Sequence, residues 1–415
     1  MTERYAYKYT AKGEYPPDWY VDLLDRFWEV TDCKHVTATF VPRGIPVASI
    51  REVQSRFVSL VHANQTTAYF YAILVEGGRD PREGDLIFSR NATVGAVAQV
   101  ASWHPKFAMG QDVCLLRRKV DGFAPGFLQA LIQSPVIGRQ LDELMVGSTF
   151  KRVNVQQIRA FIIPMPSAVE QRAIAAALSD ADALLDAIDR VIAKKRAIKQ
   201  ATMQQLLTGR TRLPGFSGEW AVKRLGELGL FVKGQGVRKD QARSGEVPCI
   251  RYGEIYTVHN DIVRRFNSFV SRDVAATATP LRPGDILFAG SGETKAEIGK
   301  SVAFTGTGEA VAGGDIVILR QSGQDAHFLG YYLNTDAIAA QKSGYGQGDA
   351  VVHIGAGSLA KIEVRLPPLP EQRAIAAALL DMDAELEALQ QRRHKTERLK
   401  QGMMQELLTG RTRLV

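Results

Sequence analysis

Glu170-Gln-Arg-Ala-Ile-Ala-Ala-Ala-Leu178 decides the fold, because the same residues return as Glu371–Leu379. A second stretch, Leu206-Leu-Thr-Gly-Arg-Thr-Arg-Leu213, returns as Leu407–Leu414. Aligned without gaps, residues 170–213 and 371–414 are identical at 27 of 44 positions, with an offset of 201. The chain is therefore a tandem duplication.

Each copy of the repeat predicts one long helix. Apolar residues recur in alternating steps of four and three, which is typical of a coiled-coil seam. Neither copy contains Pro, and Gly209 and Gly410 stand where a C-terminal cap would end each helix. About 38 residues at 1.5 Å each give a helix of roughly 57 Å. The predicted seam, which would pair the helices and dock partner subunits, is Ile174, Leu178, Leu185, Ile188 and Ile192 in the first copy and Ile375, Leu379, Met382, Leu386 and Leu389 in the second.

The charges predict how the two helices pair. Acidic residues fill the first half of each copy, at 180–189 and 381–387, and basic residues dominate the second half, at 190–199 and 392–400. An antiparallel pair brings acidic halves against basic halves, whereas a parallel pair opposes like charges. The alternative is a solvated charged face that happens to be asymmetric.

Composition indicates a globular protein of two or more domains, with 415 residues, 45% hydrophobic and 23% charged. The net charge of +8 favours a polyanionic partner. No apolar run approaches the roughly 18 residues of a membrane span, and the first residues lack a signal core. Three separated cysteines form no metal or redox pair. We therefore expect a cytoplasmic protein with unpaired thiols.

The duplication continues outside the helices. Gly84–Phe88 matches Gly284–Phe288 at an offset of 200, and Gln111–Arg117 matches Gly314–Arg320 at 203. Short apolar runs such as these read as strands, and 126–140 and 326–342 read as helices. We predict an α+β fold with two similar domains, at 1–168 and 214–367, joined by long antiparallel helices at 169–213 and 368–415 in a pseudo-twofold, circular arrangement.

Catalytic motifs are weak in this sequence. No methyltransferase tetrapeptide of the Asn/Asp-Pro-Pro-aromatic type is present, and Thr294 stands where a phosphate-binding loop ending at Gly299-Lys-Ser301 needs its first Gly. Asp285 with Glu293-Thr-Lys295 mimics the spacing of one nuclease class, but the first half has no such triad. The seven His residues show no metal-ligand spacing. We predict neither a catalytic nor a metal site.

Polar loops after matching strands predict a DNA-binding surface in each domain, because their side chains supply paired donors and acceptors for base edges. Lys and Arg would mainly bind phosphate. Each of these residues can also be an ordinary solvated loop residue. The candidates are Arg51, Gln54, Arg56, Asn64, Gln65, Ser89, Arg90, Asn91, Thr93, Lys151 and Arg152 in the first domain and Lys233, Arg238, Arg251, Tyr252, Ser291, Glu293, Thr294 and Lys295 in the second.

The doubled helix motifs resemble those of the specificity subunit of Type I restriction-modification systems. They are Pro-x-x-x-Glu-Gln-Arg-Ala-Ile, at 166–174 and 367–375, and Leu-Leu-Thr-Gly, at 206–209 and 407–410. The resemblance covers nearly the whole chain. It implies that each variable domain is a target-recognition domain for one half of a bipartite DNA site, with readout loops at the aligned positions 89–93 and 291–295. One departure is that Cys33–Arg43 lacks the Gly-rich start found at Val232–Gly236.

The same resemblance implies partners and cofactors. The helices would set the spacing and dock two methyltransferase subunits, which bind S-adenosylmethionine, and through them the restriction subunits, which use ATP and Mg. The chain itself would bind no cofactor and would be non-catalytic. Two alternatives are a specificity subunit of a related bipartite-site system of the Type IIB kind and a protein-interaction scaffold that does not bind DNA. A nuclease is opposed by length, because two domains and two helices leave no residues for a catalytic domain.

Overall fold

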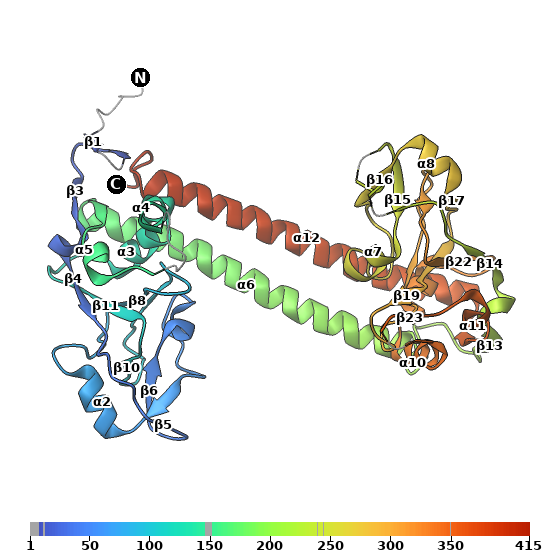
Figure 1. The fold of residues 1–415 in the computed structure, drawn as a ribbon, viewed down its shortest axis with the longest axis horizontal. Coiled ribbons are helices and arrows are strands. Elements are labelled where there is room, and N and C mark those ends of the chain that lie inside the picture. Colours follow the sequence, from blue (N-terminus) through green and yellow to red (C-terminus); the bar gives the residue numbers. More distant parts are fainter. Residues whose placement is uncertain (1–7, 11–12, 146–151, 239, 244, 349) are drawn as a thin grey trace. The chain divides into compact units, whose positions relative to one another are not determined.

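The computed structural model describes residues 8–10, 13–145, 152–238, 240–243, 245–348 and 350–415. Contacts divide the chain into two units, residues 1–190 with 391–415 and residues 191–390. Each unit combines an α+β domain with one part of each long helix (Figure 1). We call the α+β parts the first domain and the second domain.

The two long helices are α6, Ala168–Leu206, and α12, Leu369–Leu407, of 39 residues each. At the start of α6, the Ser167 hydroxyl accepts a hydrogen bond from the Glu170 N–H at 3.2 Å. Gly209 and Gly410 both have a φ of +70°, the left-handed conformation that ends a helix without a steric penalty for glycine. The predicted C-terminal caps are confirmed.

Ion pairs join α6 to α12 within each unit. They are Lys400–Asp182 and Arg393–Asp189 in the first unit and Lys195–Glu385 and Lys199–Asp383 in the second, with N–O distances of 2.5 to 2.7 Å. In both units the residue number on α12 falls as the number on α6 rises. The helices therefore run antiparallel, as the charge pattern predicts.

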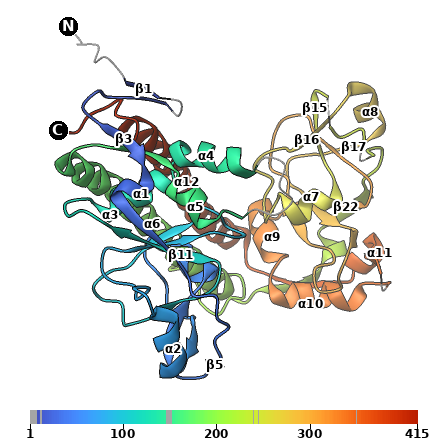
Figure 2. The ribbon, with the colours of Figure 1, turned by 60° about the vertical axis from the view of Figure 1, so that its left-hand side comes forward.

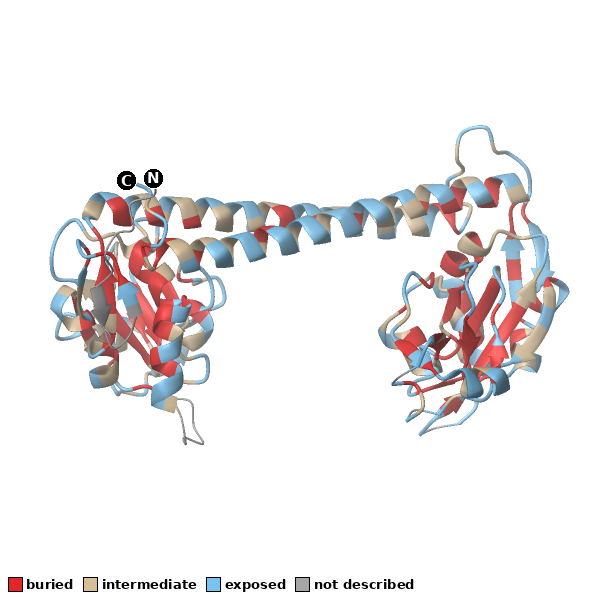
Figure 3. Cartoon of the chain, turned by 90° about the horizontal axis from the view of Figure 1, so that it is seen from above, coloured by how far each residue is buried: buried red, intermediate tan, exposed pale blue. Residues whose placement is uncertain are grey.

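The predicted seam residues face away from solvent. Within their units, seven are buried and three are half-buried, while the flanking positions are largely exposed (Figure 3). The buried residues are Ile174, Leu178, Ile188, Ile192, Ile375, Leu379 and Leu386, and the half-buried ones are Leu185, Met382 and Leu389.

The first domain is built on a four-stranded antiparallel sheet in the order β4-β11-β8-β9, beside a second four-stranded sheet in the order β10-β6-β7-β5. The strands of these sheets are β4 Trp28–Asp32, β11 Val113–Arg118, β8 Leu86–Ser89, β9 Val97–Gln99, β10 Ala108–Met109, β6 Ile45–Ala48, β7 Asn64–Thr66 and β5 Phe40–Val41. Two further pairs are β3 Tyr20–Leu23 with β12 Ile162–Met165 and β1 Lys8–Thr10 with β2 Gly13–Tyr15. The helices are α1 Leu24–Phe27, η1 Ile50–Val53, α2 Ala68–Val75, α3 Pro125–Ile132, α4 Pro135–Met145 and α5 Val155–Arg159.

The second domain repeats this plan, with sheets in the orders β14-β22-β18-β20 and β16-β15-β21-β17. Their strands are β14 Gly229–Lys233, β22 Ile316–Gln321, β18 Asp285–Ala289, β20 Ser301–Ala303, β16 Ser268–Val270, β15 Val247–Ile250, β21 Val311–Ala312 and β17 Thr279–Pro280. Two strand pairs complete it, β13 Ala221–Arg224 with β24 Glu363–Leu366 and β19 Ser291–Gly292 with β23 Val352–His353. The helices are η2 Leu225–Glu227, α7 Tyr252–Thr257, α8 Arg272–Thr277, α9 Ala326–Tyr332, α10 Asp336–Tyr345 and α11 Ala356–Leu359. Figure 2 shows α9 against the sheet, where it contacts β18 and β20.

Each domain shares its core with helix ends. In the first unit, Phe88 and Phe127 pack in one apolar cluster with Ile174 of α6 and Leu407 of α12. In the second unit, Leu207 and Ile375 join the matching cluster around Phe288. Burial of these apolar side chains is the main term that holds each domain to its helix ends.

The helices expected at 126–140 and 326–342 are each divided in two. Pro135 opens α4, because proline lacks the N–H that a continuous helix would need. In the second domain α9 ends at Tyr332 and α10 begins at Asp336 after the extended Thr335. Among the described helices, none is both long and apolar enough to cross a membrane.

Candidate nucleic-acid interface

The central strands β8 and β18 lead into equivalent turns. The Arg90 N–H donates to the Asp112 carbonyl at 2.8 Å, and the Gly290 N–H donates to the Asp315 carbonyl at 2.7 Å. Asp112 and Asp315 have φ values of 64° and 58°, so both turns rest on a left-handed aspartate. Arg90 therefore corresponds to Gly290, and the residues that follow begin the two loops.

The two loops close at equivalent glycines but differ in length. The Gly95 N–H donates to the Ser89 carbonyl and the Gly299 N–H to the Ala289 carbonyl, each at 3.2 Å. The loops are thus 91–94 in the first domain and 291–298 in the second, which is four residues longer. The expected alignment of 89–93 with 291–295 is wrong by two residues, because the offset of 200 found in the strands extends into the turn.

A polar cluster surrounds the loop of the first domain. The Gln54 Nε2 donates to the Thr93 Oγ1 at 2.8 Å, and Asn91 forms a β-bridge with Arg152. Arg152 also pairs with Asp112, at 3.6 Å between Nη2 and Oδ1. Except for Asp112, these are predicted candidates, and the structure brings them together around one loop.

A cavity of about 540 Å³ extends this cluster. Arg51 and Asn64, two predicted candidates, line it together with Asp112. Thr37 and Gln111 also line it, joined by a hydrogen bond of 3.4 Å from Nε2 to Oγ1. The sequence interpretation missed both, since Thr37 lies in a segment without a motif and Gln111 was used only to align the repeats.

Four other candidates of the first domain are buried or contact neighbouring residues of the domain. Ser89 and Arg90 are only 0% and 3% exposed, so we correct the expectation that they contact bases directly. The Gln65 Oε1 accepts the Gly44 N–H at 2.6 Å, and the Arg56 guanidinium lies 5.0 Å from the centre of the Phe57 ring. Lys151 lies outside the described residues.

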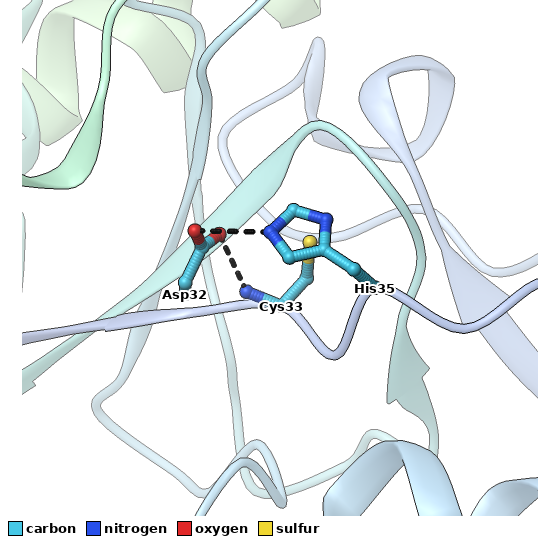
Figure 4. A group of neighbouring side chains, drawn as sticks. All are labelled: Asp32, Cys33 and His35. Carbon is cyan, nitrogen blue, oxygen red and sulfur yellow. Dashed lines mark hydrogen bonds and ion pairs between the residues drawn. The ribbon is translucent and has the colours of Figure 1, made fainter.

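Arg90 is buried because it serves an ion pair. Its Nη2 lies 2.6 Å from the Asp32 Oδ1 and 3.9 Å from the Cys33 Sγ. Asp32, Cys33 and His35 place one potential metal-ligating atom each within 4.8 Å of one another (Figure 4). The guanidinium already supplies the positive charge that a metal ion would bring, and burial raises the pKa of the Cys33 thiol, which disfavours the thiolate a metal needs. We therefore interpret Arg90 and Asp32 as a structural ion pair rather than as part of a metal site.

Ser291 in the second domain is also buried, at 4% exposure, so we correct its expected role in direct readout. Its Oγ lies 2.9 Å from the His353 Nδ1, and its carbonyl accepts the Tyr256 hydroxyl at 3.2 Å. A Cβ on Gly292 would lie 2.7 Å from the Tyr256 hydroxyl oxygen, so this position has no room for a side chain. His353 and Tyr256 were missed by the sequence interpretation, because they come from distant segments.

The tip of the second loop is exposed. Glu293, Thr294 and Lys295 all face solvent, and the Thr294 Oγ1 lies 3.5 Å from the Glu297 Oε2. The other candidates of the second domain lie at strand ends and helix starts. They are Lys233 at the end of β14, the exposed Arg238, the half-buried Arg251 just before α7, and Tyr252, 39% exposed, at its first position.

Asp285, the acid of the nuclease-like spacing, is engaged in the fold. It is 2% exposed, pairs with the Arg320 guanidinium at 3.6 Å and accepts the Arg282 N–H at 2.9 Å. Burial raises its pKa. The equivalent Asp85 in the first domain pairs with Arg117 at 2.6 Å, so this aspartate is a repeated structural element.

Several known proteins are similar to this chain over nearly its whole length. A putative type I restriction enzyme MjaX specificity subunit from Methanocaldococcus jannaschii is 24% identical over 438 residues, covering 98% of this chain and 97% of the relative. The S subunit of a Type I restriction-modification system from M. genitalium has a similar fold, with a TM-score of 0.58 at 15% identity over 96% of this chain and 99% of that one. The HsdS subunit from Thermoanaerobacter tengcongensis matches with a TM-score of 0.50 at 21% identity, over 96% and 99%.

The family described as Type I restriction modification DNA specificity domain matches residues 64–199 and 217–398. These two matches cover most of the chain and fall once in each half of the duplication. The chain belongs to the family of Type I restriction-modification specificity subunits.

Proposed function

We propose that the chain is the sequence-specific DNA-recognition subunit of a Type I restriction-modification complex. Each domain reads one half of a bipartite site through the loop that follows its central strand. In this proposal the first domain uses Asn91, Thr93 and Gln54, and the second uses Glu293, Thr294 and Lys295.

One observation carries this proposal. Two loops start from the same hydrogen-bonded turn, at Asp112 and Asp315, yet differ in length and in side chains. A shared frame with unlike tips suits two unlike short sequences better than it suits one repeated ligand. The net charge of +8 adds the long-range attraction that a polyanionic duplex requires.

The long helices set the distance between the half-sites and dock two methyltransferase subunits in this proposal. A solved structure that concerns complex assembly and conformational transition of the type I restriction-modification system contains a chain similar to this one, with a TM-score of 0.59 at 20% identity. S-adenosylmethionine would bind to the methyltransferase subunits, and ATP and Mg to the restriction subunits. The chain itself is non-catalytic.

The methylome of a host that expresses the chain with its cognate methyltransferase subunit tests this function. Single-molecule sequencing is expected to show one motif of two short unlike halves around a fixed gap, methylated on both strands. A host that expresses the methyltransferase subunit alone is the control. A stable complex that methylates no such motif would overturn the proposal.

A further inference from the structure

Lys342 of α10 is a fully buried lysine in the second domain. It is 2% exposed, and burial alone shifts its pKa, without a contribution from any carboxylate of the described residues. Its Nζ donates instead to two backbone carbonyls, Gly299 at 2.7 Å and Leu333 at 2.9 Å. Burial of an amine without a counter-ion is costly, so this contact needs a local reason.

The contact lies where the loop 291–298 ends. Gly299 has a φ of +70°, and its N–H donates to Ala289 at the loop's start. Lys342 therefore fixes the closing residue of the loop from the carbonyl side, while the strand end fixes it from the N–H side. At the other end, Ser291 is held by His353 and Tyr256.

Two contacts hold the second half of the loop. The Ile298 side chain is 1% exposed and packs in the apolar cluster around Phe288. Ala296 and Glu297 before it are exposed and line, together with Lys342, a cavity of about 340 Å³, so they lack the close contacts of a packed segment. The two hydrogen bonds from Lys342 add a polar anchor directly after Ile298, where the loop closes.

The first domain solves the same problem without a charge. An ideal Cβ on Gly95 would lie 3.0 Å from the Leu141 Cδ1, and one on Gly299 would lie 3.1 Å from the Lys342 Cδ. Leu141 therefore occupies the position of Lys342. The loop of the first domain spans only 91–94, so an apolar contact suffices there. The longer loop of the second domain uses a hydrogen-bonding anchor instead.

We propose that Lys342 is a specificity-positioning residue, which sets the conformation of loop 291–298 and so the presentation of Glu293, Thr294 and Lys295 to the second half-site. Lys342 touches no base itself. This inference rests on the proposed function, and it assigns a role in recognition to a residue that is wholly inside the domain.

The test variant is Lys342→Met, which keeps the straight side chain and removes the donors. Leu141→Met in the first domain is the matched control. Each full-length variant is assembled with the methyltransferase subunit, and its affinity is measured for duplexes that carry single changes in either half of the methylome motif. Lys342→Met is expected to reduce discrimination in the second half-site by about tenfold, because one hydrogen-bonding anchor of the loop is lost. Discrimination in the first half-site is expected to stay unchanged.

A second variant and a DNA-free measurement guard against misfolding. Lys342→Gln retains two N–H donors and is expected to recover part of the discrimination, which a purely apolar packing role would not allow. Hydrogen exchange without DNA is expected to be faster at 291–300 in Lys342→Met and unchanged at 91–96. Faster exchange with unchanged discrimination, or equal loss at both half-sites, would overturn the inference. If wild-type complex shows no bipartite preference, the proposed function fails instead, and exchange still reports on the anchor.

Discussion

Arg413 donates two hydrogen bonds from its guanidinium to the Glu170 carboxylate, from Nη2 to Oε2 at 2.7 Å and from Nε to Oε1 at 2.5 Å. Glu170 is fully buried at the start of α6, and it also accepts the Trp19 indole N–H at 3.1 Å. The duplicate contact joins Arg212 to Glu371, which is equally buried. The repeated Thr-Gly-Arg-Thr-Arg motif thus places an arginine on the first turn of the other long helix.

Replacing Arg413 by alanine is expected to destabilise the first unit by about 3 kcal/mol, because Glu170 would remain buried without its counter-charge. Urea unfolding of the variant measures the loss. Arg411→Ala, an exposed neighbour, is the control and should unfold like the wild type. The Glu170→Gln, Arg413→Ala double variant should recover part of the loss, and a double variant no more stable than Arg413→Ala would contradict this account.

Tyr331 is expected to anchor the second domain to the helices in a way the first domain lacks. Its hydroxyl donates to Asp383 of α12 at 2.5 Å, and the Arg264 Nη2 donates to the same oxygen at 2.9 Å. Ala130 stands at the equivalent position in α3. Tyr331→Phe should lower the free energy of unfolding of the second unit by about 1 to 3 kcal/mol, since a charged acceptor loses a donor. Calorimetric unfolding measures the loss, and Tyr345→Phe, at an exposed tyrosine of α10, is the control. Equal losses of stability in the two variants would argue against the anchor.

Lys342 predicts a pH dependence of stability. Burial lowers its pKa to about 7 in the folded chain, whereas the ordinary value is 10.5. Between these values the unfolded chain binds more protons than the folded one, so stability rises as the pH increases from about 7 to 10.5. Lys342→Met should lack this rise. Its stability relative to the wild type should therefore be greatest at the acidic end of this pH range. Denaturant unfolding at several pH values checks it, and parallel curves for the two proteins would refute the prediction.

Glu293 and Lys295 are expected to act differently on DNA although they share one loop. Lys295→Ala should weaken binding to all sequences and reduce the slope of log affinity against log salt by about 1, the loss of one phosphate contact. Glu293→Gln should change base preference within the second half-site alone. Thr93→Ala in the first loop is the matched control, with its change confined to the first half-site. A base preference that shifts in both halves for either variant would count against separate reading by the two loops.

The long helices could be predicted from the sequence, whereas much of the proposed recognition surface could not, and particular residues show the physical reasons. The seam from Ile174 to Ile192 repeats with one period, so a local pattern suffices to identify it. Arg90 is polar and follows a strand, like a readout residue, but its partner Asp32 lies on a strand far away in sequence. The burial of Ser291 likewise depends on His353. Pairings between distant strands decide which polar side chains remain exposed, and a single sequence does not contain them.

The proposed spacing role of the helices predicts that lengthening them changes the gap between the half-sites. Seven residues inserted after Arg190 in α6, together with seven after Gln390 in α12, fall at the boundary of the two units in both helices. This pair of insertions keeps Lys400–Asp182 on one side and Lys199–Asp383 on the other, so the antiparallel register survives within each unit.

The double insertion adds about 10 Å, or two helical turns, and should widen the unread gap of the methylated motif by about three base pairs at 3.4 Å each. Both half-sites should stay the same, since neither loop is changed. Insertion into α6 alone is the control, because it moves the acidic and basic partners out of register and should abolish methylation or give mixed gaps. A double-insertion methylome with the wild-type gap would show that something other than helix length measures the distance between the half-sites.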